Sequence, residues 1–127
     1  MTSERQEVKK IFAKLCKQRP QTFPQFREPL DAPLKPGVYV IRKGKNVLHV
    51  GRTSSAKYGI YQRLYNHLNG ASSFTDKYLD GKGETLRKGH TYQYLVVKDK
   101  RLRAFLEAYA IGMLCPKHIG LGVKIKG

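Results

Sequence analysis

One short stretch of the sequence, residues 36–68, is dense in side chains that can transfer protons or bind phosphate. It reads as a strand, a polar turn, a second strand, a loop and a helix. In the helix, a histidine follows an arginine by four residues, so both lie on one face. Imidazole and phenol groups exchange protons, and guanidinium groups bind phosphate oxygens. We expect five such side chains to meet at one end of a small sheet: Tyr39, His49, Arg52, Arg63 and His67.

The elements that must position these side chains follow from local patterns. Valine-rich segments flank the polar turn at residues 43–46, which predicts a hairpin over residues 36–51, and Gly37 and Gly51 bracket it. A helix is expected at about residues 58–69. Its core face carries residues spaced by four: Ile60, Leu64 and Leu68.

The N-terminal third predicts a helix followed by an extended arm. Ser3 and Gln6 fit a capping box for a helix over residues 3–18. Its apolar residues recur at helical spacing and its lysines fill the other face, which we interpret as a solvated face rather than a dedicated DNA-binding helix. Residues 19–36 hold five of the six prolines, so we expect an extended connection on the domain surface. Three apolar side chains should attach it to the core: Phe23, Phe26 and Leu30.

The second half of the chain also predicts a mixture of helices and strands. We expect a short helix at residues 72–79, capped by Ser72 or Ser73, a polar loop at 80–90 and a third strand at 92–97. Asp99 can cap a helix over residues 100–114. An apolar stripe is expected along that helix: Leu102, Phe105, Leu106, Tyr109, Ala110 and Met113. The order of elements predicts an α+β fold, a small antiparallel three-stranded sheet flanked by helices, with an N-terminal helix.

Residues 36–118 resemble the core of the GIY-YIG nuclease family. The first motif is Gly37-Val38-Tyr39 and the second is His49-Val50-Gly51. The helix supplies Arg63 and His67, and a later helix supplies Glu107, followed by Pro116. The string Gly59-Ile60-Tyr61 is set aside, because no second motif follows it at hairpin distance.

The resemblance implies roles for these residues. It makes Glu107 the ligand of a divalent cation, Mg²⁺ or Mn²⁺, which accepts one carboxylate and completes its shell with water and phosphate oxygens. The alternative for Glu107 is an ion pair with Arg103, one turn earlier. Arg63 would stabilise charge on the phosphate. Tyr39 would exchange a proton, which requires cationic neighbours to lower its pKa; its alternative is a packed strand tyrosine.

Two positions depart from the family pattern. His49 stands where the family has tyrosine, and an imidazole with a pKa near 6.5 can accept a proton near neutrality. We therefore expect His49 to act as general base or to share that role with Tyr39; the opposite interpretation is weakened catalysis. The family commonly has an asparagine after the proline, and His118 or Ile119 occupies that region here. His67 is expected to position the tyrosine or the nucleophile, or to be structural.

Composition agrees with a nucleic-acid partner. There are 25 basic and 9 acidic residues, a net charge of +16, and the basic residues are spread along the chain. A folded surface for polyanions is therefore expected. Cys16 and Cys115 show no metal-ligand spacing, and two reduced thiols are favoured over a disulfide. The sequence has no apolar run of membrane-spanning length and no signal peptide, so cytoplasmic location is the default expectation.

The resemblance implies a divalent-metal-dependent DNA endonuclease, whereas the composition alone indicates a polyanionic partner, so RNA is an alternative substrate. Its expected catalytic residues are Tyr39, His49, Arg63, His67 and Glu107, the last also the metal ligand; Arg52, Lys57 and Tyr61 are expected to bind nucleic acid. One alternative is a nucleic-acid-binding module that kept the fold and lost the chemistry. A weaker one is a basic structural protein of a ribonucleoprotein. The expected organisation is an N-terminal helix and arm (1–35), a nuclease-like domain (36–119) and a tail (120–127).

Overall fold

The computed structural model describes residues 3–54 and 57–119. Its centre is an antiparallel sheet built from β1 (Gln21–Thr22), β2 (Gly37–Lys43), β3 (Asn46–Arg52) and β4 (His90–Val96). The strands lie in the order β1-β4-β2-β3. The α+β fold with an antiparallel sheet is confirmed. The sheet gains a fourth strand because the extended arm pairs Gln21 and Thr22 with the start of β4.

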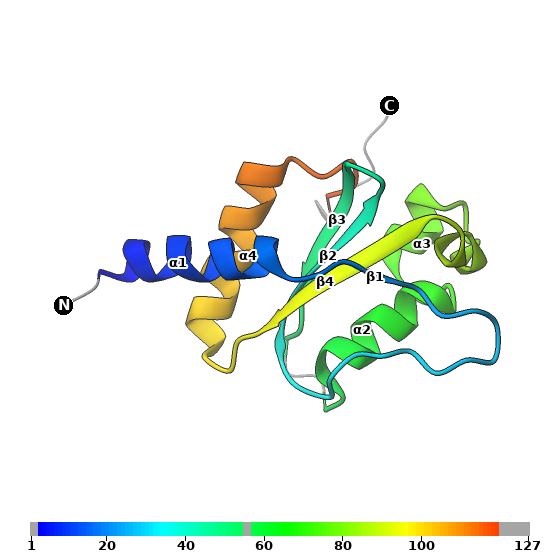
Figure 1. Ribbon diagram of the computed structural model, residues 1–127, viewed down its shortest axis with the longest axis horizontal. Helices are drawn as coiled ribbons and strands as arrows, with labels where there is room; N and C mark the ends of the chain where they lie inside the picture. Colours follow the sequence, from blue (N-terminus) through cyan, green and yellow to red (C-terminus); the bar gives the residue numbers. More distant parts are fainter. Residues whose placement is uncertain (1–2, 55–56, 120–127) are drawn as a thin grey trace.

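Four α-helices cover the sheet: α1 (Glu4–Lys17), α2 (Gly59–Leu68), α3 (Ser73–Tyr78) and α4 (Lys100–Leu114). Figure 1 shows α1 and α4 on one side of the strands, with α2 and α3 on the other. A short 3₁₀ helix, η1 (Gly83–Arg87), lies within the expected loop at residues 80–90. The predicted caps are confirmed, since the side chains of Ser3, Ser72 and Asp99 each accept a hydrogen bond from the first turn of their helix.

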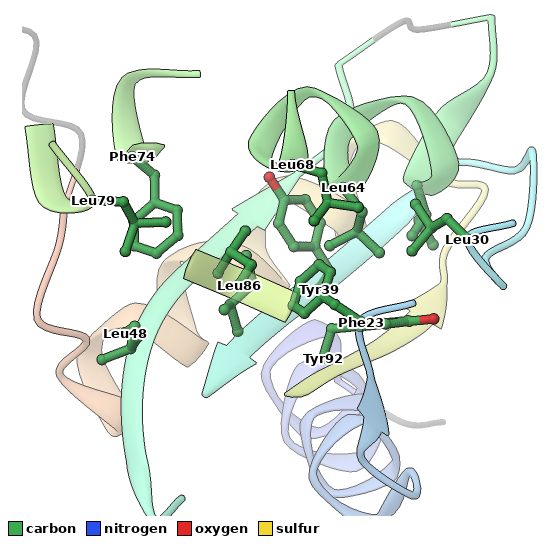
Figure 2. Close-up of a cluster of buried hydrophobic side chains, with 12 residues drawn as sticks. Phe23, Leu30, Tyr39, Leu48, Leu64, Leu68, Phe74, Leu79, Leu86 and Tyr92 are labelled. Atoms are coloured by element: carbon green, nitrogen blue, oxygen red, sulfur yellow. The ribbon is translucent and has the colours of Figure 1, made fainter. Parts of the chain in front are cut away.

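Strand β2 separates two hydrophobic clusters by simple alternation. Val38 and Val40 face α1 and α4, where they pack with Leu15 and Leu106. Tyr39 and Ile41 point to the opposite face, because successive strand residues alternate. That second cluster also contains Phe23, Leu64, Phe74, Leu86 and Tyr92, and Figure 2 shows Tyr39 in its midst.

Regular pairing with β2 places the histidine of β3 on the same face as Tyr39. Gly51 pairs with Tyr39 and His49 pairs with Ile41, and the register shifts only after Ile41. Directly paired residues project to the same side of a sheet. His49 therefore projects toward α2 and α3, together with Tyr39.

Three apolar side chains do not lie where the sequence predicts. Phe23 and Leu30 attach the arm to the core as expected, but Phe26 is 67% exposed. Phe105 and Met113 are also exposed, so the predicted stripe on α4 is wrong at these two positions. The buried face of α4 instead carries Arg103, Leu106 and Ala110. The tail at residues 120–127 lies outside the described residues.

Both cysteines, Cys16 and Cys115, are free thiols. Within residues 3–54 and 57–119, none of the helices has the length and apolar character needed to cross a bilayer.

Candidate active site

A cavity of about 230 Å³ opens beside β3, where residues from α2, α3 and α4 come together. Six lining side chains can carry charge or exchange a proton: His49, Arg52, Arg63, His67, Glu107 and His118. The structure thus gathers four of the five predicted catalytic side chains around one cavity. The fifth, Tyr39, is fully buried and lies behind the cavity wall, against Gly51 and His67.

The two motif glycines are required by close packing. A Cβ atom on Gly51 would overlap the Tyr39 hydroxyl, so only glycine lets the phenol ring lie against β3 at this point. A Cβ atom on Gly37 would overlap the Leu95 carbonyl of the neighbouring strand. The glycines therefore fix the depth at which Tyr39 sits below the cavity.

Tyr39 is the most deeply buried of the proton-exchanging groups. Its hydroxyl lies 2.7 Å from Nε2 of His67. Burial raises the pKa of Tyr39 to about 12, although the nearby positive charge of Arg63 opposes that rise. The expectation of a lowered pKa is therefore wrong, because the cost of desolvating a phenolate exceeds the attraction of one guanidinium.

A closed set of hydrogen bonds fixes the tautomer of His67. The Thr75 hydroxyl donates to the His67 carbonyl, and the Ser72 hydroxyl donates to Thr75 Oγ1. With its own proton committed, Ser72 Oγ must accept from Nδ1 of His67, which lies 2.6 Å away. Burial holds the pKa of His67 well below its usual value, so the ring is neutral. Nε2 then carries a lone pair and accepts the hydrogen bond from Tyr39.

His49 lies at the cavity wall between two other rings. Its imidazole stacks on Phe74, with centroids 4.8 Å apart and ring planes 19° apart. Its Nδ1 lies 3.1 Å from Nδ1 of His118, which leaves Nε2 for a molecule in the cavity. Burial, followed by the charges of His118 and Arg63, lowers the pKa of His49 to about 3. The assumption of a pKa near 6.5 is wrong: His49 is a neutral imidazole throughout the physiological range.

Arg63 contributes a positive charge to the cavity lining. Its Nε atom is buried and has no hydrogen-bond partner among the described residues. Its charge also opposes protonation of His49 and His67. Because Arg63 lines the cavity and its guanidinium is always charged, the cavity favours an anionic ligand.

Glu107 pairs with Arg52. The Oε1 atom of Glu107 lies 3.3 Å from Nε of Arg52, and its side chain is only 24% exposed. Burial raises the pKa of Glu107, while the charges of Arg52 and Arg63 oppose that rise. The alternative pairing with Arg103 is wrong.

Arg103 instead binds the backbone on both sides of the site. Its buried guanidinium donates to four carbonyl oxygens, those of Thr53, Ser54, Val97 and Lys98. The first two follow Arg52 directly, and the last two precede α4. Arg103 therefore holds the loop after β3 against the start of the helix that carries Glu107.

Two of the residues expected to bind nucleic acid lie outside the cavity lining. Lys57 is exposed and lies over the Tyr58 ring. Tyr61 stacks on Tyr65 and packs against the hydrophobic cluster that contains Tyr39. Their roles in nucleic-acid binding stay predictions.

The sequence matches no protein-family model and no curated protein. Solved structures do match. The GIY-YIG N-terminal endonuclease domain of UvrC from Thermotoga maritima, bound to its catalytic divalent cation, magnesium, is 24% identical at a TM-score of 0.51. That match covers 68% of this chain and 85% of the UvrC domain chain. A variant of the same domain with one tyrosine replaced by phenylalanine is 20% identical over 87% of this chain and 92% of the domain chain, also at a TM-score of 0.51.

This chain has a GIY-YIG fold. Within that fold the motif glycines pack as described above, and the two strands of the hairpin carry Tyr39 and His49 to one face. The resemblance in the sequence is therefore confirmed at the level of the fold.

The side chains that line this cavity fit a divalent cation bound by a single protein carboxylate. Within the described ranges, no cluster of three or more histidine, cysteine, aspartate or glutamate side chains could form a closed metal cage. The cavity lining offers one carboxylate, that of Glu107. Mg²⁺ is commonly bound by one or two carboxylates plus waters and substrate phosphates, so a single half-buried glutamate suits it.

Sequence reasoning missed three residues that shape the site. Ser72 and Thr75 fix the tautomer of His67, but the sequence suggested only a helix cap for Ser72. Arg103 lies three residues before Leu106 and seven before Ala110, so its place on the buried face of α4 was detectable from helical spacing.

Proposed function

We propose that this protein is a divalent-metal-dependent endonuclease that hydrolyses phosphodiester bonds in DNA, with Mg²⁺ or Mn²⁺ as its cofactor. The supporting observation is the cavity itself, where a half-buried carboxylate, an arginine with an unsatisfied donor and a neutral imidazole meet within a GIY-YIG fold. The net charge of +16 favours a polyanionic substrate, and RNA is the alternative to DNA.

Arg63 binds the scissile phosphate in this proposal. Its guanidinium lines the cavity and is always charged, and its planar fork suits phosphate oxygens. A divalent cation held by Glu107 would neutralise charge that develops on the phosphate and on the leaving oxygen. Once Glu107 is engaged in this way, Arg52 is free to contact the nucleic-acid backbone on the same side of the cavity.

His49 is better placed than Tyr39 to act on the attacking water. Its Nε2 is left for a molecule in the cavity, whereas Tyr39 is buried and its hydroxyl is bonded to His67. A neutral imidazole can accept a hydrogen bond from water at any physiological pH. A phosphate anion entering the cavity raises the pKa of His49, because a nearby negative charge favours the imidazolium. The base therefore gains strength when substrate is bound.

Tyr39 and His67 act as a supporting pair in this scheme. Tyr39 keeps its proton at neutral pH, because its pKa is raised to about 12, and its hydroxyl donates a hydrogen bond to Nε2 of His67. The pair lies against Gly51 and beside Arg63, so it holds the floor of the cavity in place.

Removal of the carboxylate tests the proposal directly. We expect wild-type protein to nick supercoiled plasmid in Mg²⁺ or Mn²⁺ and to be inactive with chelator. Glu107→Gln should lower the rate by roughly 100-fold or more, because charge stabilisation by one such group contributes on that order. Nicking and linearisation would be followed on gels, with branched and single-stranded DNA tested alongside.

Glu84→Gln is the matched control, because Glu84 also pairs with an arginine but lies outside the cavity. It should cleave like wild type. Cleavage that persists in chelator, or a Glu107→Gln variant as active as wild type, would refute the metal-ligand role.

A binding module on the same fold is the second candidate. The observation that favours it is the ion pair between Arg52 and Glu107, which already satisfies the carboxylate. A pure binder would show salt-sensitive affinity for nucleic acid, no cleavage of any substrate, and unchanged affinity in Glu107→Ala.

A further inference from the structure

Two histidines share a hydrogen bond at the edge of the cavity. Nδ1 of His49 lies 3.1 Å from Nδ1 of His118, and the two ring centroids are 5.2 Å apart. The backbone N–H of His118 donates to the carbonyl of Leu48, so His118 is tied to β3 next to His49. Phe74 stacks on the His49 ring and fixes its plane. Both rings are therefore held in place, His118 through its backbone and His49 through Phe74.

A bond between two ring nitrogens needs one donor and one acceptor. Both rings are neutral at physiological pH, because burial lowers the pKa of each. Two arrangements are then available: His49 donates from Nδ1 and keeps a lone pair on Nε2, or it accepts at Nδ1 and carries its proton on Nε2.

The charges in the cavity select the first arrangement. Arg52, Arg63 and Glu107 line the same cavity as His49. Glu107 is paired with Arg52, so the charge of Arg63, which acts on His49, is left over, and a guanidinium offers donors but no acceptor. A lone pair on Nε2 is attracted by this cation, whereas an Nε2–H group would be repelled by it. His118 is the less buried ring of the two, so its own Nε2–H can reach water.

We propose that His118 is a positioning residue for His49: it accepts the Nδ1–H of His49 and thereby holds the Nε2 lone pair of His49 in the cavity. This inference rests on the proposed function, since it takes His49 as the group that acts on water. The residue in this region, where the family commonly has asparagine, then sets the tautomer of the imidazole that replaces the family's tyrosine.

Two substitutions at one position separate the acceptor from the ring. His118→Phe keeps an aromatic ring beside Phe74 but removes the acceptor, whereas His118→Asn supplies a carbonyl oxygen in its place. His90→Asn is the matched control, because His90 bonds to the backbone carbonyl of Lys88 and lies outside the cavity lining.

The first readout is the tautomer itself, from ¹⁵N NMR of histidine-labelled protein, with the His49 signals assigned by their loss in His49→Gln. We expect wild type, His118→Asn and His90→Asn to carry the His49 proton on Nδ1. In His118→Phe the proton should move to Nε2, the nitrogen that free histidine prefers to protonate. Finding the proton on Nε2 in wild type would overturn the proposal, whether or not the protein cleaves DNA.

The second readout is cleavage. His118→Phe should lower kcat by about 100-fold with little change in KM, because general-base catalysis contributes at least that factor. His118→Asn should stay within about tenfold of wild type on the same scale. An unchanged kcat in an otherwise active His118→Phe would refute the proposal. Loss of the tautomer in that variant, in a protein that never cleaves, would instead refute the proposed function alone.

Discussion

Burial governs how the proton-exchanging side chains around the cavity titrate. His49 and His67 are held neutral and Tyr39 is held protonated, in each case with desolvation as the largest cause. The phenol can therefore donate to His67, and neither imidazole repels the nearby guanidinium of Arg63. The cavity carries its positive charge on arginine alone until an anion enters.

This burial predicts that acid destabilises the metal-free protein. The folded-state pKa of His49, about 3, lies below the unfolded value near 6.5, and that of His67 is also depressed. Below pH 6.5 the unfolded chain binds protons that the folded chain does not. The free energy of unfolding should therefore fall as pH drops from about 6.5 toward 3, by about 1.4 kcal/mol per pH unit for each histidine.

Urea unfolding in chelator, at about pH 7.5 and about pH 5.5, measures this slope. His49→Gln should make this slope shallower without abolishing it, because the lowered pKa values of His67 and His118 still contribute. Equal slopes in wild type and His49→Gln would show that His49 is not buried in its neutral form.

Among the elements, α4 contributes to the site in two ways. One side of the helix presents Glu107 to the cavity, and one turn earlier Arg103 binds the carbonyls that follow β3 and precede the helix. These bonds connect the position of Arg52 to the position of Glu107. A buried cation satisfied only by carbonyls makes no ion pair, so its contribution depends on backbone geometry.

Arg103→Met should therefore destabilise the fold and displace the loop after β3. Four carbonyls lose their donor, and a buried polar group left unpaired costs about 1–3 kcal/mol. We expect a loss of at least about 3 kcal/mol in urea unfolding. Arg101→Met is the control: Arg101 lies on the same helix but is 70% exposed and pairs with Glu4, so its replacement should leave the free energy of unfolding nearly unchanged. Equal losses would contradict the role given to Arg103.

Local signals in the sequence predict the helices and strands well, but they predict poorly which elements pack against one another. Ser3, Ser72 and Asp99 cap their helices as expected, because capping involves residues only a few positions apart. The exposure of Phe26 and Met113 depends on which faces meet across the sheet, and periodicity within one segment does not contain that information. The short strand β1 was missed for the same reason, since only its pairing with β4 makes it a strand.

The candidate site was also predictable from the sequence only in part. The ordered motifs in the sequence identified His49, Arg63, His67 and Glu107 as candidates, and all four line one cavity. The sequence did not reveal that Tyr39 lies behind the wall, or that burial shifts the pKa values of Tyr39 and His49 away from neutrality. Desolvation depends on how the folded molecule packs, so the spacing of residues in the sequence does not predict it.

At the scale of the whole molecule, the surplus of positive charge should make nucleic-acid binding strongly salt dependent. Lys57 lies just before α2, near the loop that follows Arg52, whereas Lys14 lies on the exposed face of α1 on the other side of the sheet. Lys57→Gln should reduce the slope of log affinity against log salt by about one, and Lys14→Gln should leave it unchanged.

Fluorescence anisotropy with labelled DNA between about 50 and 200 mM salt measures these slopes, because affinity changes by orders of magnitude over that range. Both variants lose one exposed lysine, so their net charges are identical. An equal reduction in the two would mean that the molecule binds through its overall charge rather than through the side that carries the cavity.

The small number of internal ion pairs has a consequence for folding. Within the described ranges there are three, and they leave most of the 25 basic side chains without an acidic partner. The positive charges repel one another in the compact state, and this repulsion lowers the stability of the fold unless ions in solution screen it. A polyanion that binds only the folded form would raise the melting temperature by mass action. A nucleic-acid substrate would then also act as a folding ligand, protecting the molecule while bound and leaving it less stable at each release.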